Sequence, residues 1–283
     1  MSTQKKLRKR GSAIGRFFVY AILIALSISM LFPLYWMIRG AFMESALDVM
    51  DVSQLLPNKF DFGNFVEAFE SAPFGRYFLN TIYLVVFNVT ATVISCSFVA
   101  FGFSRIHFRY RNALFAIMLG CMMIPGTVMQ IPQFVGWVNV GAYDTHLPLT
   151  IPSLFGSATY IFMLRQFFMS LPKEYDEAAI IDGANYFRIY WQIILPLSKP
   201  ALLTIGVFTF MGVWNDFFGP LIYLADEMNW TLAIGLSNFQ GQYSSDWHLL
   251  MAASCVLALP LIVVYFFAQR YFIEGIALTG VKG

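Results

Sequence analysis

The residues best able to form specific polar contacts lie in one short segment, which runs from Asp176 to Pro196 and reads DEAAIIDGANYFRIYWQIILP. Three acids and an arginine set it apart from the apolar sequence on either side. Carboxylates in the first turn of a helix are stabilised by the helix dipole and can pair with basic groups of a partner. The alternative is an ordinary amphipathic loop at the lipid surface, but an acidic first turn suits an anionic inner leaflet poorly. We therefore expect this segment to bind another protein.

The sequence offers no comparable constellation for catalysis. It contains no G-x-x-x-x-G-K-[ST] phosphate loop and no G-x-G-x-x-G nucleotide fingerprint. Neither its three histidines nor its three cysteines have the spacing of a metal site or a catalytic triad. We therefore expect that the chain is not an enzyme, that it has no catalytic residue, and that it binds no metal and no cofactor of its own.

The composition is that of a membrane protein, since 58% of the 283 residues are apolar and 12% are charged. Six stretches contain no Asp, Glu, Lys or Arg, and they are 17–38, 77–104, 112–143, 145–164, 200–215 and 247–269. A hydrocarbon core needs about 20 helical residues. The fifth stretch reaches that length only if Asp216 is accepted inside a helix that continues to Leu224. We predict an all-α protein with six transmembrane helices, at 16–39, 78–104, 112–137, 147–169, 199–224 and 247–269.

The basic residues predict the orientation of these helices. With the N-terminus inside, fifteen of the eighteen Lys and Arg residues fall in inner segments, and only Arg39, Lys59 and Arg76 fall in outer ones. This asymmetry obeys the positive-inside rule, so both termini are expected in the cytoplasm. The net charge of +2 then reflects topology and membrane lipid rather than nucleic acid.

The predicted domain organisation follows from these spans. A basic cytoplasmic arm (1–15) precedes a six-helix transmembrane domain (16–273), and a cytoplasmic tail (274–283) ends the chain. The polar segment occupies 170–198 on the cytoplasmic side. Amphipathic spacing within 62–78 predicts a short interfacial helix in the first outer loop.

Two groups of polar residues could line a substrate pathway. Pro125 is expected to break the third helix in its outer half, with Gln130 and Gln133 beyond the break. The alternative is a helix end that reaches interfacial water. Trp214, Asn215 and Asp216 lie near the outer end of the fifth helix, where they could form the mouth of a cavity or serve as a packing anchor.

The polar segment itself reads as two short helices. Asp182 and Gly183 form a pair typical of a turn. Ile180, Ile181, Ala184 and Phe187 recur at helical spacing and form an apolar stripe.

In this segment the chain resembles bacterial ABC importer permeases, which carry an EAA signature. The matching residues, in the order and spacing of that signature, are Glu177, Ala178, Ala179, Gly183, Ile193, Leu195 and Pro196. The stretches VWNDFFGPLIYL, TLAIGLSNFQGQYSSDWHLLMAA and QRYFIEGIALTGVKG are similar to the maltose-type carbohydrate subfamily, so the resemblance covers nearly the full length.

The resemblance implies a type I ABC importer permease in the bacterial inner membrane. In such importers the EAA segment is a coupling helix that docks on a cytoplasmic ATPase, here with Glu177 paired to a basic residue. It further implies a second homologous permease, a dimer of ATPase subunits that uses ATP and Mg, an extracytoplasmic solute-binding protein and a sugar substrate. Residues implied to contact the binding protein are Gly235, Asn238, Gln240 and Tyr243. Residues implied to lie at the ATPase interface are Arg270, Gly275 and Lys282.

We therefore expect the permease subunit of an ATP-driven, binding-protein-dependent importer of sugars or oligosaccharides. One alternative is a permease for another solute, such as a phosphorylated polyol. A second is an ion-coupled secondary transporter, but that class needs ionisable residues at the membrane midplane, and the predicted spans have essentially none.

Overall fold

A computed structural model describes the backbone of residues 2–242 and 246–280. Side chains are not described at 2–14, 238–242, 268 and 270–280. Every regular element within the described backbone is a helix, which confirms the all-α prediction for that part of the chain. The chain divides into two compact units, and these are Met1–Ser71 with Phe239–Leu257, and Ala72–Asn238 with Ala258–Gly283.

Several helices are long and apolar enough to cross a membrane, which makes the chain a multi-pass membrane protein. Four qualify singly, and they are Gly15–Ala41, Phe74–Arg105, Leu147–Ser170 and Trp247–Phe267. Two bent pairs would raise the number to six, and they are Arg111–Cys121 with Gly126–Asn139, bent by 93°, and Tyr186–Leu197 with Lys199–Trp214, bent by 77°.

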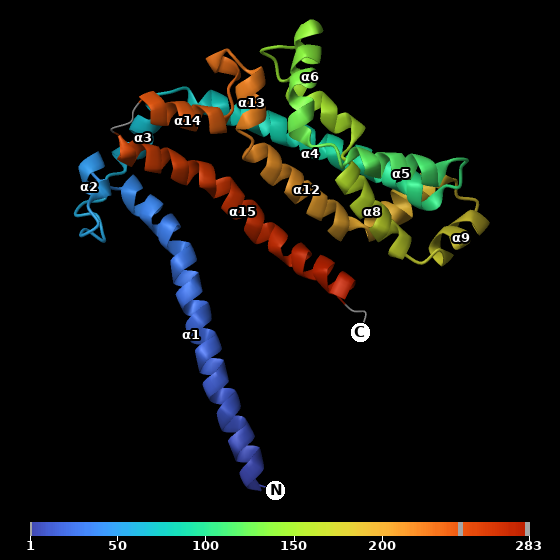
Figure 1. Cartoon of the computed structure of the whole chain (residues 1–283), viewed down its shortest axis with the longest axis horizontal. Coiled ribbons are helices and arrows are strands. Elements are labelled where there is room, and N and C mark those ends of the chain that lie inside the picture. The colour runs from blue at the N-terminus through green and yellow to red at the C-terminus, as the bar shows by residue number, and fades with distance from the viewer. Residues whose placement is uncertain (1, 243–245, 281–283) are drawn as a thin grey trace. The chain divides into compact units, whose positions relative to one another are not determined.

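The first unit contains the long helix α1 (Ser2–Ala41), the blue helix of Figure 1, which runs without a break through the predicted basic arm. The most apolar 18 residues of its span include none that is buried within the chain. Two short helices follow, α2 (Ala46–Met50) and α3 (Gly63–Glu70). The helix predicted within 62–78 is therefore α3, which ends before the second span begins at Phe74. Helix α2 was not expected from the sequence.

Arg39, at the C-terminal end of α1, holds the loop that contains α2. Its side chain is buried and lies over the Trp36 ring, with the guanidinium carbon 4.2 Å from the ring centroid. The guanidinium donates to four backbone carbonyls, those of Asp48 (3.0 Å), Val49 (3.0 Å), Asp51 (2.7 Å) and Gln54 (2.6 Å). One cation thus pairs with four backbone carbonyls of this loop.

Replacing Arg39 by methionine should destabilise this loop strongly. Four carbonyls would lose a charged donor, and we expect a loss of about 2–4 kcal/mol in the free energy of unfolding, measured in detergent. Limited proteolysis within 46–55 should also accelerate. Arg76→Met is the matched control, because Arg76 is exposed and donates to a single carbonyl, that of Met228, at 3.2 Å. For the control we expect a loss of under about 0.5 kcal/mol in the free energy of unfolding. Equal losses for both variants would contradict the assignment.

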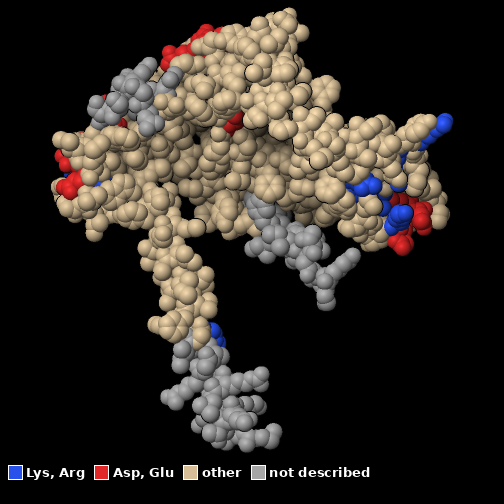
Figure 2. Space-filling view, viewed as in Figure 1, with Lys and Arg blue, Asp and Glu red and all other residues tan. Residues whose placement is uncertain are grey.

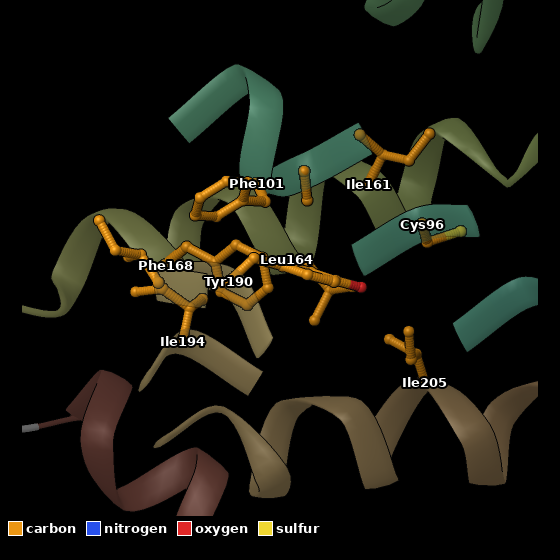
Figure 3. Packing of buried hydrophobic residues seen from close by; sticks show 10 residues of the cluster. Cys96, Phe101, Ile161, Leu164, Phe168, Tyr190, Ile194 and Ile205 are labelled. Atoms are coloured by element: carbon orange, nitrogen blue, oxygen red, sulfur yellow. The ribbon is translucent and has the colours of Figure 1, made fainter. Parts of the chain in front are cut away.

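The second unit is built around α4 (Phe74–Arg105), which packs against α8 (Ala158–Ser170) and α12 (Lys199–Trp214). These helices share one hydrophobic cluster with the polar segment (Figure 3). Its buried members are Cys96, Ala100, Phe101, Ile161, Leu164, Phe168, Ile189, Tyr190, Ile194 and Ile205. The cluster therefore ties the polar segment to the transmembrane helices.

The predicted break in the third helix is confirmed. Helix α5 (Arg111–Cys121) ends four residues before Pro125, and α6 (Gly126–Asn139) starts directly after it. The residue Pro125 has an extended backbone, which directs the chain away from the axis of α5. Pro132 does not break α6.

The fourth span is composite. It begins with α7 (Leu147–Thr150) and the 3₁₀ helix η1 (Ile151–Phe155), and α8 follows after Gly156. Gly156 has φ +77°, and a Cβ there would lie 3.3 Å from the Cys96 sulfur. Glycine is thus required both by the backbone conformation and by close packing.

The prediction of one continuous helix from 199 to 224 was wrong. Helix α12 ends at Trp214, and a separate α13 (Phe218–Tyr223) follows. The Asn215 amide donates to the Met211 carbonyl at 2.8 Å, and the Asp216 carboxylate accepts the Gly219 N–H at 3.1 Å. These side chains satisfy backbone groups at the two helix ends, which stabilises the break.

The predicted outer loop 225–246 contains helical structure, namely the 3₁₀ helix η3 (Glu227–Asn229) and most of α14 (Leu232–Gln242). The last helix, α15 (Trp247–Gly280), extends past its predicted end at 269, because no proline follows Pro260.

Candidate functional site

The polar segment folds as a helix, a turn and a second helical stretch. Helix α9 (Glu174–Ile181) carries its acids in the first turn, as predicted. It ends at Asp182, and Gly183 adopts φ +78°. The Ala184 N–H bonds the Ala179 carbonyl at 2.9 Å, and the Gly183 N–H bonds the Ile180 carbonyl at 3.0 Å. This is a Schellman cap, so the predicted turn at Asp182 and Gly183 is confirmed.

The second stretch returns the chain to the membrane through three short pieces. They are α10 (Tyr186–Ile189), the π turn η2 (Tyr190–Ile194) and α11 (Leu195–Leu197). The Asn185 side chain caps α10 by accepting the Arg188 N–H at 2.8 Å. The Leu195 N–H bonds the Tyr190 carbonyl, five residues earlier, immediately before Pro196, which has no N–H to donate.

One face of the polar segment is buried against the transmembrane helices. Ile189, Tyr190 and Ile194 enter the hydrophobic cluster, and Figure 3 shows Tyr190 beside Phe101 and Leu164. The Tyr190 hydroxyl lies 2.8 Å from the Ser97 hydroxyl on α4. Partly buried residues that complete this face are Ala179, Ala184 and Leu195.

The opposite face is exposed and combines a carboxylate with apolar side chains. Glu177 and Ala178 are exposed. The apolar residues beside them, with their exposed fractions, are Ile180 (50%), Ile181 (85%), Tyr186 (51%) and Phe187 (65%). The predicted apolar stripe is thus divided, because Ala184 packs inward and its other members face outward. Figure 2 shows acidic and basic residues side by side at the end of the molecule where Figure 1 places α9. We name Glu177, Ala178, Ile180, Ile181, Tyr186 and Phe187 the exposed face.

Four further residues of the EAA signature lie outside the exposed face. Gly183 and Pro196 are exposed, and Ile193 and Leu195 are half-buried. A Cβ at Gly183 would meet no atom within 4 Å, so its backbone conformation alone requires glycine.

A buried ion pair joins α9 to α4. The Arg105 Nε lies 3.0 Å from one carboxylate oxygen of Asp176, and the two side chains are 4% and 15% exposed. The same guanidinium donates to the Leu171 carbonyl at 3.0 Å. Burial raises the pKa of the Asp176 carboxyl, and the Arg105 guanidinium opposes that shift. The charge on Asp176 therefore depends on Arg105.

The predicted pathway residues lie on α6, at the end of α12 and in the break that follows α12. Gln130 is half-buried and Gln133 is exposed on α6. Trp214 is buried, with its ring 5.5 Å from the Phe210 ring and 6.2 Å from the Phe78 ring. Trp214 thus packs within the chain, and Asn215 and Asp216 bond backbone groups at the helix break, so the substrate-pathway role of these residues stays a prediction.

The residues predicted to contact a binding protein or an ATPase through the outer loop and the tail are only partly described. Gly235 is buried, and a Cβ there would lie 2.3 Å from the Tyr77 ring. Close packing, rather than exposed contact, accounts for this glycine. The others lie outside the part of the chain whose side chains are described, and they are Asn238, Gln240, Tyr243, Arg270, Gly275 and Lys282.

Comparison with protein families matches residues 93–277 to the binding-protein-dependent transport system inner membrane component. The matched residues include the whole polar segment. Among curated proteins, the chain is 32% identical to the probable ABC transporter permease protein YurM of Bacillus subtilis (strain 168), over 95% of this chain and 90% of that one. It is 31% identical to the arabinooligosaccharides transport system permease protein AraQ of the same organism, over 95% and 98%.

A solved structure shows the same fold. It is a crystal structure of a bacterial ABC transporter involved in the import of the acidic polysaccharide alginate. The match has a TM-score of 0.79 and 25% identity, and it covers 90% of this chain and 95% of that chain.

Proposed function

We propose that this chain, which belongs to the family of binding-protein-dependent transport system inner membrane components, is the permease subunit of an ATP-driven importer of sugars or oligosaccharides. The observation that carries this proposal is the exposed face on the polar segment. A carboxylate beside one small residue and four large apolar side chains is a surface built for a protein partner. A transport subunit without a phosphate loop needs such a partner to supply ATP hydrolysis.

The proposed solute class rests on the relatives. AraQ, which covers nearly the same length, is described as a permease for arabinooligosaccharides. The transporter with the same fold is described as importing a polysaccharide. Both solutes are polymers of sugar units, so we propose a sugar or oligosaccharide for this chain.

The proposed assembly contains two homologous permeases, two ATPase subunits that use ATP and Mg, and an extracytoplasmic binding protein. Counting each of the two bent helix pairs as one crossing gives the six crossings proposed for this chain. The basic residues favour both termini and the polar segment on the cytoplasmic side of the bacterial inner membrane.

The proposed mechanism is a rigid-body transfer of motion. Closure of the ATPase subunits moves α9 through the exposed face. The buried face of the same segment packs on α4, α8 and α12, so these helices move with it and the cavity between the two permeases changes sides.

The energy source tests the proposal. Membrane vesicles loaded with ATP should accumulate the sugar that co-purifies with the cognate binding protein, even after the proton and sodium gradients are collapsed. An ATPase subunit should also co-purify with the chain. Uptake that stops with the gradients and continues without ATP would show a secondary transporter instead.

Labelling of an introduced cysteine tests the orientation. Tyr186→Cys, made with Cys121→Ser to remove an exposed thiol, should react with an impermeant maleimide only in inside-out vesicles. The control Leu56→Cys lies in the first outer loop, where the native side chain is 67% exposed, and it should react only in intact cells. Labelling of position 186 from outside would place the polar segment on the wrong side of the membrane.

A further inference from the structure

The outer end of α4 holds the segment that precedes α14. The Asn80 amide donates to the carbonyls of Met228 (2.8 Å) and Trp230 (2.9 Å), and the Leu232 N–H donates to the Thr81 hydroxyl at 3.0 Å. Asn80 and Thr81 are both buried. Buried hydrogen bonds of this kind fix the position of a segment, because each broken bond leaves an unpaired polar group.

A second set of bonds holds the same segment from the other side. The Asp144 carboxylate accepts the N–H groups of Ala225 and Asp226, both at 2.9 Å. The Asn229 amide donates to the Asp144 carbonyl at 3.0 Å, and the Asn229 carbonyl lies 2.9 Å from His146 Nε2. Residues 225–232 are thus fixed to the outer end of α4 and to the turn before α7. We name 225–232 the outer segment.

The inner end of α4 holds α9 through Arg105. This guanidinium pairs with Asp176 and donates to the Leu171 carbonyl, so it bridges the last residue of α4 to both ends of the 171–176 stretch. Arg105 Nε and the other carboxylate oxygen of Asp176 are both buried without a hydrogen-bond partner in the described part of the chain. The two side chains are therefore joined as an ion pair, with 3.0 Å between Nε and the nearer carboxylate oxygen.

The body of α4 connects these two ends without a break. It has 32 residues and contains no proline, which corresponds to a rod about 48 Å long. A helix of this kind transmits displacement from one end to the other, provided that both ends are held.

We propose that the Arg105–Asp176 ion pair is the positioning contact that transmits movement of α9 through α4 to the outer segment. The inference rests on the proposed function, because movement of α9 is assigned there to an ATPase. Arg105 and Asp176 are not assigned to substrate binding, and they act by fixing α9 to α4. The ATPase moves α9 through the exposed face, and the ion pair transmits this movement from α9 to α4.

Hydrogen exchange on the complete importer in lipid nanodiscs tests the inference. Exchange is compared with and without ATP and vanadate, and the readouts are the amides of α9 and those of the outer segment. In the native chain, ATP and vanadate should change the exchange rates of both groups of amides. The main variant replaces both partners by apolar residues, Arg105→Met with Asp176→Leu, because a paired replacement leaves no buried charge unpaired and is expected to fold. In this variant the amides of α9 should show the native change in exchange, and the change in exchange of the outer segment should be reduced at least fivefold.

Three further variants separate position from stability. Asp176→Glu keeps the pair and should keep the response of the outer segment within twofold. Arg105→Lys keeps the charge but replaces the two nitrogens that contact Asp176 and the Leu171 carbonyl by a single ammonium group, so it should reduce the response of the outer segment two- to fivefold. Glu174→Gln, at an exposed acid of α9, should leave the exchange responses of α9 and of the outer segment unchanged.

The outcomes distinguish this inference from the proposed function. A native chain whose α9 does not respond to ATP and vanadate contradicts the proposed function. A native chain that responds at both ends, with an apolar pair variant that transmits normally, overturns the inference alone. If the apolar pair does not assemble, normal transmission by Arg105→Lys overturns it, and a two- to fivefold loss supports it.

Discussion

The variant Glu177→Lys should lose its ATPase subunit and reduce solute uptake at least about 100-fold. Glu177 is exposed in the first turn of α9, beside the exposed Ala178 and away from the hydrophobic cluster. If it pairs with a basic residue of the partner, reversal places two cations in contact where the native interface has an ion pair. Juxtaposed like charges cost several kcal/mol, and a 100-fold loss of affinity needs only about 2.7 kcal/mol.

The measurement is co-purification of the ATPase subunit together with uptake in the same membranes. Asp182→Lys is the matched control, because it makes the same change of charge at another exposed residue five positions further along. Five residues turn a helix by about 140°, so this position points away from the face of Glu177. The control should keep uptake within about threefold, and both variants should insert at native levels. A Glu177→Lys chain that transports normally and keeps its ATPase would remove the coupling role of the exposed face.

The parts of the fold that could be predicted from the sequence are those fixed by local rules. Charge-free stretches of about 20 residues indicate spans, and four of the six have a matching single helix or composite span in the structure. Pro125 indicates a break because proline cannot donate within a helix, and the break is present. The pair of Asp182 and Gly183 predicts a turn because glycine adopts a left-handed backbone at low cost.

The parts that could not be predicted depend on contacts between distant residues. The break after Trp214 is stabilised by the Asp216 carboxylate, and an intramembrane acid in the sequence is equally compatible with a continuous helix. The apolar stripe of the polar segment was visible as a pattern, but which members face the cluster is decided by α4 and α8. Arg105 and Asp176 lie 71 positions apart, and nothing local to either residue indicates its partner.

The variant Gly183→Val should reduce uptake at least tenfold, although a Cβ at residue 183 would contact no other part of the chain. A Cβ at this position meets open space, so the cost comes from the backbone alone. An ordinary residue held at φ +78° costs about 1–2 kcal/mol, and a β-branched residue costs more. The chain can relieve this strain by opening the Schellman cap, which breaks the bonds that the N–H groups of Gly183 and Ala184 make.

Opening the cap separates the two halves of the exposed face, because Glu177 lies before the turn and Tyr186 lies after it. Docking on a partner needs both halves in one arrangement, so uptake should fall while membrane insertion stays at the native level. Gly183→Asn is the matched control, since asparagine tolerates the left-handed conformation better than other non-glycine residues, and it should keep at least about half of native uptake. Uptake by Gly183→Ala should lie between that of the valine variant and that of the asparagine variant. Equal uptake by the valine and asparagine variants would show that the turn does not set the geometry of the exposed face, and the ATPase would then have to recognise α9 by itself.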